Sequence, residues 1–210
     1  MAATRPAPGA LPGRFVRLDP MTEADAPALA AALHRPEVFA GGYGGGPSGL
    51  PGTPEDFAAF LRDYYSTGGP RLNYVLRLSA GPDEGAVVGA TSLGDLDEER
   101  EAAHIGWTAY RPEVWGTVVN PEAKLLLLDT AFRHGYGRVR LQADARNDRS
   151  RAAIAKLGAV FEGVVRHERR RPDGSWRDTA VYSILVEEWP GVRAGLEARL
   201  DRWGERPITL

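Results

Sequence analysis

A turn that leads directly into an apolar helix is the sequence feature that most constrains the fold of this chain. The segment WGTVVNPEAKLLLL, residues 115–128, begins as a turn, and Asn120 has the short polar side chain that caps a helix. Pro121 suits the first helical position, and Glu122 places a carboxylate near the positive end of the helix dipole. The leucines that follow predict a helix with a broad apolar face. The start of this helix is either a structural cap or an anion-binding site.

Length and composition indicate one globular domain. The chain has 210 residues, of which 43% are hydrophobic and 26% are charged, enough to bury a substantial core. The net charge of −2 gives no electrostatic argument for a nucleic-acid or membrane partner. The chain has no cysteine, which excludes disulfides, thiolate metal sites and an acyl-cysteine intermediate. Because no apolar run approaches the roughly 20 residues of a membrane span and a signal-peptide core is lacking, we expect a cytoplasmic protein.

Periodicity predicts a mixed α+β domain. Residues 1–13 are rich in Ala and Pro and predict a flexible arm, residues 14–190 form the main domain, and residues 191–210 are a C-terminal helix and tail packed on it. The predicted strands are 14–18, 72–78, 86–93, 104–110, 138–145, 160–170 and 177–186. The predicted helices are 24–33, 54–66, 121–134, 148–158 and 188–203. This order favours a mixed sheet packed with helices.

A glycine-rich connection covers residues 41–54, with seven glycines and three prolines. Gly42, Gly44 and Gly46 have the spacing of a dinucleotide fingerprint, but no strand precedes them and no helix follows at once. We therefore predict a mobile loop.

Several segments together resemble one enzyme family. They are the strand-like run 102–110, the turn and helix 115–128, and the later positions Asn147, Ser150, Ala153, Leu157, Gly158, Ala159, Glu162 and Gly163. Over residues 14–200 the chain resembles the GNAT acyltransferases, and within them the ribosomal-protein-alanine/serine N-acetyltransferase-like branch. The resemblance implies a mostly antiparallel, twisted sheet of about seven strands flanked by helices, in which the fourth and fifth strands splay apart.

The same resemblance implies a donor, an acceptor and a binding site. The donor is acetyl-CoA, the acceptor is a primary amine of a peptide N-terminus or a small molecule, and no metal takes part. Neither nucleic acid nor membrane is implied as a partner, and a homodimer is allowed. The implied coenzyme-binding residues are Ile105, Trp107, Thr108, Ala109, Trp115, Gly116, Thr117, Val118, Val119, Asn120, Asn147 and Ser150.

The chain departs from the family at its pyrophosphate loop. The usual pattern there is Gln or Arg, two residues, Gly, one residue, then Gly or Ala, and these places hold Trp115, Val118 and Asn120. The missing glycine is the one that lets a backbone approach phosphate closely.

Two residues are candidates for proton transfer. Ser150 matches the family position near the coenzyme sulfur, where a hydroxyl can assist the leaving thiolate, although a solvated helix serine explains it equally well. His104 has a side chain whose ordinary pKa suits proton abstraction from an ammonium, although a lone strand histidine is also commonly structural. Glu101 and Glu168 are weaker candidates for the base, and Asp178 is explained as well by a hairpin salt bridge.

Two charged segments carry alternatives of their own. The acidic run of residues 95–101 is either a solvated turn or a feature that attracts a cationic acceptor. The basic run of residues 167–172 is either a charged sheet edge or a binding patch.

The function that these observations favour is direct acetyl transfer from acetyl-CoA to an amine. One alternative keeps the fold but changes the acyl donor or takes a polyamine or antibiotic amine. Another is a catalytically weak protein that binds coenzyme A for regulation. A structural protein of the ribosome is a third, against which the slightly acidic net charge argues.

Overall fold

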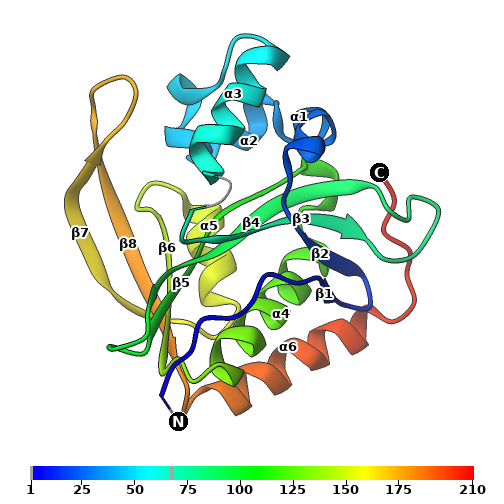
Figure 1. Ribbon diagram of the computed structural model, residues 1–210, viewed down its shortest axis with the longest axis vertical. Coiled ribbons are helices and arrows are strands. Elements are labelled where there is room, and N and C mark those ends of the chain that lie inside the picture. Colours follow the sequence, from blue (N-terminus) through cyan, green and yellow to red (C-terminus); the bar gives the residue numbers. More distant parts are fainter. Residues whose placement is uncertain (1, 67–68) are drawn as a thin grey trace.

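A single eight-stranded sheet runs through the molecule, in the order β1-β2-β3-β4-β5-β6-β8-β7 (Figure 1). The computed structural model describes residues 2–66 and 69–210. The strands are β1 (Leu11–Pro12), β2 (Val16–Pro20), β3 (Leu72–Leu78), β4 (Val87–Asp97), β5 (Ala102–Tyr110), β6 (Arg138–Asp144), β7 (Val160–Arg170) and β8 (Trp176–Leu185). Only β5 and β6 pair in parallel, which confirms the predicted mixed and mostly antiparallel sheet.

Helices cover both faces of this sheet. They are α1 (Ala26–Leu33), α2 (Pro36–Ala40), α3 (Pro54–Tyr65), α4 (Val119–Arg133), α5 (Asp148–Ala155) and α6 (Trp189–Trp203). The apolar sides of α4 and α6 belong to the larger hydrophobic core, and those of α1, α2 and α3 to a second core. Figure 1 shows these two groups of helices on opposite sides of the strands. None of the helices in the described ranges is long and apolar enough to cross a bilayer.

Local signals in the sequence explain where two helices begin. The Thr53 side chain accepts the backbone N–H of Asp56 at 3.1 Å, with Pro54 at the first position of α3. Asn147 Oδ1 accepts the backbone N–H of Ser150 at 2.9 Å and so caps α5. Thr53 and Pro54 predict the start of α3, and the sequence leaves the cap of α5 open between Asn147 and Asp148; the structure selects Asn147.

The N-terminal segment is packed, which differs from the flexible arm expected over residues 1–13. Leu11–Pro12 pairs with β2 and supplies the eighth strand, where about seven were expected. Ala3 is buried, and the Thr4 N–H donates to the His134 carbonyl at 2.9 Å. A strand of two residues is too short to show an alternating pattern, so periodicity did not reveal it.

Helix α4 begins earlier than the sequence suggested, and the prediction that Asn120 caps it was wrong. The helix starts at Val119, so Asn120 is its second residue and makes no cap hydrogen bond. Instead, Asn120 Oδ1 accepts the Tyr110 hydroxyl at 3.0 Å. This hydrogen bond connects the first turn of α4 to the end of β5.

The glycine-rich connection is also more ordered than a mobile loop. It forms short 3-10 turns at Tyr43–Gly45 and Pro47–Gly49, and Tyr43 is buried against the aromatic side chains of α2 and α3. The Tyr43 hydroxyl lies 3.1 Å from that of Tyr65. Gly45 lies so close to Pro172, in the turn between β7 and β8, that a Cβ added at Gly45 would stand 2.7 Å from the proline ring. The connection and the hairpin tip therefore touch.

The sheet opens between its two parallel strands. Ala102, Ala103 and His104 of β5 have register partners on β6, and the described residues show none from Ile105 onward. The other edge of β6 stays paired with β8 along its whole length. This confirms the predicted splay of the fourth and fifth strands of the main domain.

A buried carboxylate fixes α4 against the start of β2. The two oxygens of Glu122 accept the backbone N–H groups of Arg14, Phe15 and Val16, each at 2.7 Å. Glu122 is 3% exposed, and a Cβ added at Gly13 would stand 2.7 Å from its carboxyl carbon. The contact spans more than 100 residues of sequence, so it joins two distant segments of the fold.

We expect Glu122→Gln to lower the free energy of unfolding by about 2–3 kcal/mol, because an amide has one acceptor oxygen and its NH₂ would face a backbone donor. Urea denaturation of both proteins measures the difference. Glu113→Gln is the matched control, because Glu113 is a partly exposed partner of Arg35 and Arg111 and should cost under about 1 kcal/mol. Equal losses in the two variants would contradict this account of Glu122.

Candidate active site

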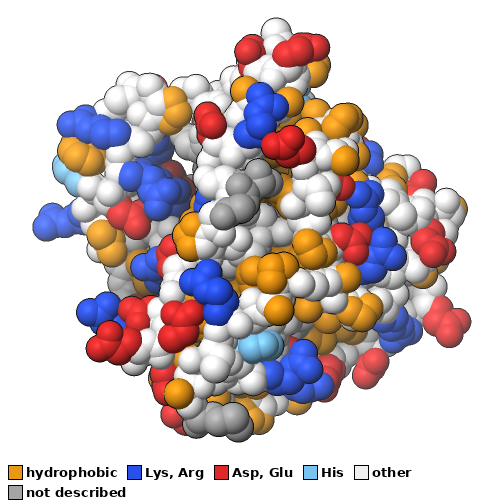
Figure 2. All heavy atoms as spheres, in the orientation of Figure 1, with side chains coloured by type: hydrophobic (Ala, Val, Ile, Leu, Met, Phe, Trp, Pro, Cys, Tyr) orange, Lys and Arg blue, Asp and Glu red, His pale blue; other side chains and the backbone are white. Residues whose placement is uncertain are grey.

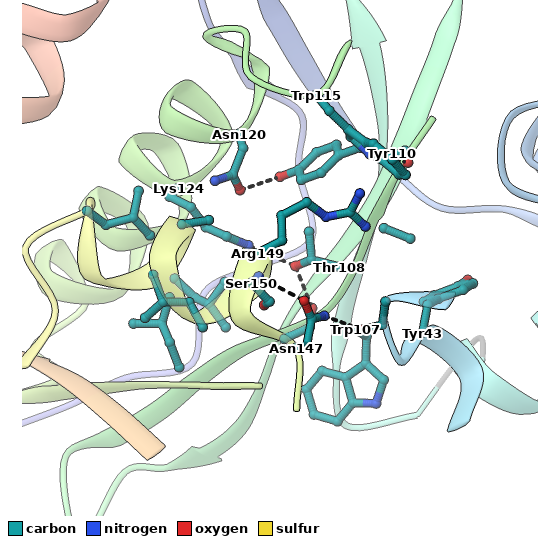
Figure 3. Close-up of a pocket in the computed structure, with 18 of the residues that line it drawn as sticks. Tyr43, Trp107, Thr108, Tyr110, Trp115, Asn120, Lys124, Asn147, Arg149 and Ser150 are labelled. Carbon is teal, nitrogen blue, oxygen red and sulfur yellow. Dashed lines mark hydrogen bonds between the residues drawn. The ribbon is translucent and has the colours of Figure 1, made fainter. Parts of the chain in front are cut away.

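A cavity of about 260 Å³ occupies the opening between the splayed strands. Its walls come from β5, the turn before α4, the first turns of α4, the middle of β6 and the start of α5 (Figure 3). Of the coenzyme-binding residues expected from the sequence, those that line it are Ile105, Trp107, Thr108, Ala109, Trp115, Gly116, Asn120, Asn147 and Ser150. The remaining expected residues are Thr117, Val118 and Val119, and they do not line it; Val118 and Val119 have side chains buried in the larger core.

A bulge in β5 lies at the point where the strands part. Ser92 of β4 pairs with Gly106, and Ala90 pairs with Ala109, so two residues of β5 stand opposite one of β4. Trp107 has a φ of +50°, in the left-handed region that a non-glycine residue seldom adopts. The Tyr65 hydroxyl donates to the Trp107 carbonyl at 2.8 Å and holds this conformation. The bulge turns the β5 backbone toward the cavity.

The turn before α4 forms one end of the cavity. Gly116 has a φ of +79°, a conformation that glycine adopts without strain. Trp115 Nε1 donates to the Tyr110 carbonyl at 3.0 Å and anchors the turn to β5. The N–H groups at the start of α4 lie at the positive end of the helix dipole, and such an end suits a phosphate.

A lysine forms the floor of the cavity. Lys124 is 5% exposed, and its Nζ donates to the hydroxyls of Thr108 at 2.8 Å and Thr91 at 3.3 Å. Figure 3 shows its side chain reaching from α4 toward Thr108. Burial lowers the pKa of Lys124 from its ordinary 10.5 to about 7. This amine therefore exchanges a proton near neutral pH.

Helix α5 supplies the opposite wall. Asn147 donates from Nδ2 to the carbonyl of Gly41, which links α5 to the end of α2. The Arg149 guanidinium stacks over the Trp115 ring at 3.6 Å and so bridges the cavity. Ser150 lines the same wall of the cavity. Its backbone N–H donates to the Asn147 side chain that caps the helix.

A second, smaller cavity of about 120 Å³ adjoins the first on the side of α2 and the β7–β8 hairpin. Gly106, Gln142 and Ser150 line both cavities, so the two meet at the bulge. The residues that line the second cavity are Gly41, Gly42, Tyr43, Tyr64, His104, Gly106, Trp107, Thr108, Gln142, Ala143, Asp144, Asn147, Ser150, Arg169 and Arg177. Tyr43 of the glycine-rich connection lines both cavities.

His104 lines the smaller cavity and is held by Asp95. Its Nδ1 is 3.1 Å from Asp95 Oδ2, whereas its Nε2 is buried without a hydrogen-bond partner among the described residues. The carboxylate favours the tautomer with the proton on Nδ1, which leaves a lone pair on Nε2. A Cβ added at Gly106 would stand 2.8 Å from Nε2, so the imidazole lies directly against the bulge.

The surroundings of His104 set its protonation. Burial lowers its pKa below the ordinary 6.5, while the hydrogen bond from Nδ1 to Asp95 opposes this shift. Asp95 also accepts from Arg140 at 2.7 Å, and His104 and Arg140 together hold the pKa of this carboxyl below its usual range. At neutral pH the imidazole is therefore uncharged and able to accept a proton.

The weaker candidates for a base lie elsewhere. Glu101 and Glu168 do not line either cavity. Glu168 accepts the Thr179 hydroxyl and pairs with Arg169 at 3.4 Å. Asp178 accepts the backbone N–H of His167 at 2.8 Å, so it stabilises the hairpin through a hydrogen bond.

A comparison with known families decides the class of this site. The family described as Acetyltransferase (GNAT) domain matches residues 16–160, more than half of the chain. The chain belongs to the GNAT acetyltransferases. Acetyl-CoA is the donor that this family implies, and the parted strands with their adjoining helix start fit such a donor.

Solved structures of GNAT proteins share the fold over nearly the whole chain. A putative acetyltransferase from T. thermophilus is 40% identical, with 94% of this chain and 100% of that one covered and a TM-score of 0.81. A GCN5-related N-acetyltransferase from Brucella melitensis is 26% identical, covers 94% and 87%, and has a TM-score of 0.83. RimJ of Mycobacterium smegmatis, in complex with CoA-disulfide, is 22% identical, covers 90% and 92%, and has a TM-score of 0.62. Among curated proteins, none matches the chain.

The sequence left several residues of this GNAT site unnoticed. Lys124 is a single cation on an otherwise apolar helix face, four residues after Asn120, and that spacing was the available signal. Asp95 belongs to the acidic run, but its contact with His104 depends on irregular pairing between β4 and β5. Gln142 and Arg177 carry no local signal, because their importance comes only from what lies beside them.

The lowered pKa of Lys124 predicts a pH dependence of stability. Between about 7 and its ordinary 10.5, the unfolded chain binds a proton that the folded chain does not, so stability should rise with pH. The slope from this group is at most about 1.4 kcal/mol per pH unit. Lys124→Met should remove that slope and raise stability at pH 7. Denaturant unfolding of both proteins at pH 7, 8 and 9 tests this, and parallel curves would contradict the buried, neutral lysine.

Proposed function

We propose that this GNAT chain transfers the acetyl group of acetyl-CoA directly to a primary amine, in a peptide N-terminus or a small molecule. One observation carries the proposal: His104 holds an unpaired, buried Nε2 against the bulge where two cavities meet. A donor cavity, an acceptor cavity and a base between them are what a direct transfer requires.

The larger cavity suits the donor. The unpaired edge of β5 offers backbone groups to the pantetheine arm, as the resemblance to the family implies for Ile105, Trp107, Thr108 and Ala109. The turn at Trp115 and Gly116 and the N-terminus of α4 would receive the pyrophosphate, with Asn147 beside the arm. Thr117, Val118 and Val119 would contribute through their backbone, because their side chains lie outside the cavity.

His104, the backbone of the bulge and Ser150 have different roles in the proposed reaction. A neutral amine attacks the thioester carbonyl carbon, the new C–N bond forms as the C–S bond breaks, and the amine proton passes to His104 Nε2. Backbone N–H groups of the bulge stabilise the negative charge on the carbonyl oxygen. The Ser150 hydroxyl donates a hydrogen bond to the departing sulfur.

The placement within the ribosomal-protein-alanine/serine branch stays a prediction. The ribosomal-protein-S5-alanine acetyltransferase from Vibrio fischeri is 18% identical, with a TM-score of 0.64, and shares the fold. The family resemblance implies peptide N-termini as one class of acceptor. Peptides with free N-termini therefore belong in any panel of amines that is tested.

The protonation of His104 predicts a distinctive pH profile. Because the pKa of His104 lies below 6.5, kcat/KM should fall only as the pH drops below that value. His104→Gln should lower kcat by roughly 100-fold or more, as loss of a general base typically does. Asp95→Asn removes the partner that raises this pKa, so the acid limb should move to lower pH while kcat also falls.

Steady-state thiol release from acetyl-CoA across pH 5 to 9 measures these effects. His134→Gln is the control, because His134 lies at the end of α4 and its side chain bonds to the carbonyl of Thr130. A His104→Gln protein that keeps its melting temperature and full turnover would remove His104 from the mechanism. An acid limb that stays in place in Asp95→Asn would remove the pairing with Asp95.

Ser150→Ala should lower kcat by about tenfold, which is about 1.4 kcal/mol of barrier, with little change in the KM for acetyl-CoA. The structure separates this effect from helix capping, since only the backbone N–H of Ser150 contributes to the cap. The melting temperature should therefore stay the same. Full turnover together with a lowered melting temperature would show that the hydroxyl has a structural role instead.

A broad panel of amines tests the proposed function as a whole. Thiol release that depends on an added amine supports it. Calorimetric binding of acetyl-CoA without turnover of any amine would favour the alternative that the sequence left open, a coenzyme-A-binding regulatory protein.

A further inference from the structure

The smaller cavity has an unusual set of unpaired polar groups. Three side-chain atoms at its lining are buried and have no hydrogen-bond partner within the described part of the chain: His104 Nε2, Gln142 Oε1 and Arg177 Nε. Buried polar atoms are nearly always paired in folded proteins, because an unpaired buried polar atom destabilises the fold. Unpaired atoms on three residues that line one cavity favour a ligand that supplies the missing partners.

The charges around this cavity are mainly positive. Arg177 and Arg169 line it from β8 and β7, and Figure 2 shows Lys and Arg side chains gathered on that hairpin, at the upper left of the view. Asp144 is the one carboxylate among the lining residues, and it is already held by Arg171 at 2.5 Å and by the backbone N–H of Arg146 at 3.0 Å. The cavity is therefore lined by two arginines, Arg169 and Arg177, and its single carboxylate is already paired.

Arg177 is the cation best placed to receive a ligand. Burial, and then the charge of Arg169, lower its pKa from the ordinary value. The opposing carboxylates of Asp144 and Glu168 are both engaged with other donors, Arg171 and Thr179. A guanidinium that is desolvated, repelled by a neighbouring cation and short of a partner gains most from an anion, which it can hold with two parallel hydrogen bonds.

We propose that the acceptor is a small molecule that carries a carboxylate or phosphate as well as the reacting amine. The anion pairs with Arg177, with Arg169 beside it, while the amine lies between His104 Nε2 and Gln142 Oε1. This inference rests on the proposed acetyl transfer and assigns the substrate class of the same site.

The walls of the cavity favour a small acceptor over a protein terminus. The glycine-rich connection meets the tip of the hairpin, since a Cβ added at Gly45 would stand 2.7 Å from Pro172 and one at Gly49 would stand 3.5 Å from it. Both segments also line the cavity, through Gly42 and Tyr43 on one side and Arg169 and Arg177 on the other, and its volume is about 120 Å³. Such a space accommodates an amino acid or a phosphorylated amine more readily than an extended peptide.

The test compares acceptors in matched pairs that differ only in charge. With the full chain and saturating acetyl-CoA, thiol release is measured for β-alanine against β-alaninamide, L-glutamate against L-glutamine, and phosphoethanolamine against ethanolamine. For at least one pair, we expect the anionic member to have a kcat/KM at least tenfold higher. Arg177→Gln should bring that ratio close to one, and Arg177→Lys should keep part of it, because the charge remains but the fork is lost.

Arg170→Gln is the matched control on the same hairpin. Arg170 is exposed, stacks over Trp176 at 3.8 Å and lines neither cavity, so the ratio should stay as in the wild type. The ratio within a pair cancels any general loss of activity, and thermal melts confirm that each variant is folded.

Each outcome bears on a different statement. Ratios near one in the wild type, or a ratio that Arg177→Gln leaves unchanged, would overturn the inference while amine-dependent thiol release still upheld the proposed function. Turnover of acidic peptides well above that of all small anionic amines would also overturn it. Binding of acetyl-CoA with no turnover of any amine would remove the proposed function and this inference together.

Discussion

The early parting of β5 and β6 is the constraint on which the site depends. Two parallel strands inside a sheet normally pair along their length, yet among the residues that the structure describes only Ala102, Ala103 and His104 have partners on β6. Backbone groups left unpaired inside a protein are costly, and a bound ligand can satisfy them. On its other side β6 is paired with β8 along its whole length, so the opening lies on the β5 side of β6 alone. The donor cavity is therefore a consequence of the sheet topology.

The two layers of helices hold the opening from opposite faces. On one face, α4 is fixed by Glu122, which binds the backbone at the start of β2, and it brings Lys124 under the bulge. On the other face, Tyr65 of α3 binds the carbonyl of Trp107. Both contacts lead to the same short segment of β5. The bulge is thus set by side chains distant in sequence, which explains how it keeps a φ of +50° at a tryptophan.

Sequence reasoning succeeded where the signal was local and repetitive. The run of strand-forming residues Leu72–Leu78, followed by a polar turn, predicted β3 with the bounds that the structure shows. It failed where geometry depends on partners far along the chain. Asn120 has the chemistry of a cap, but a hydrogen bond to Tyr110 places it inside the helix. The sequence pointed to His104 through its ordinary pKa. In the structure, Asp95 sets the tautomer of His104 and the bulge in β5 sets its position, and periodicity reveals neither contact.

The electrostatics of the site were hidden from the sequence for a further reason. A net charge of −2 describes the chain as a whole, but exposed charges more than roughly 10 Å apart are largely screened by salt. The field in a small cavity is set by the few groups that line it and by whether each is already paired. Asp144 counts as one negative charge in the total, yet Arg171 cancels it locally. Arg177 counts as one positive charge in the total and remains available. The preference that we propose for the acceptor site rests on these pairings, so it can be derived only once the fold has brought β6, β7 and β8 together.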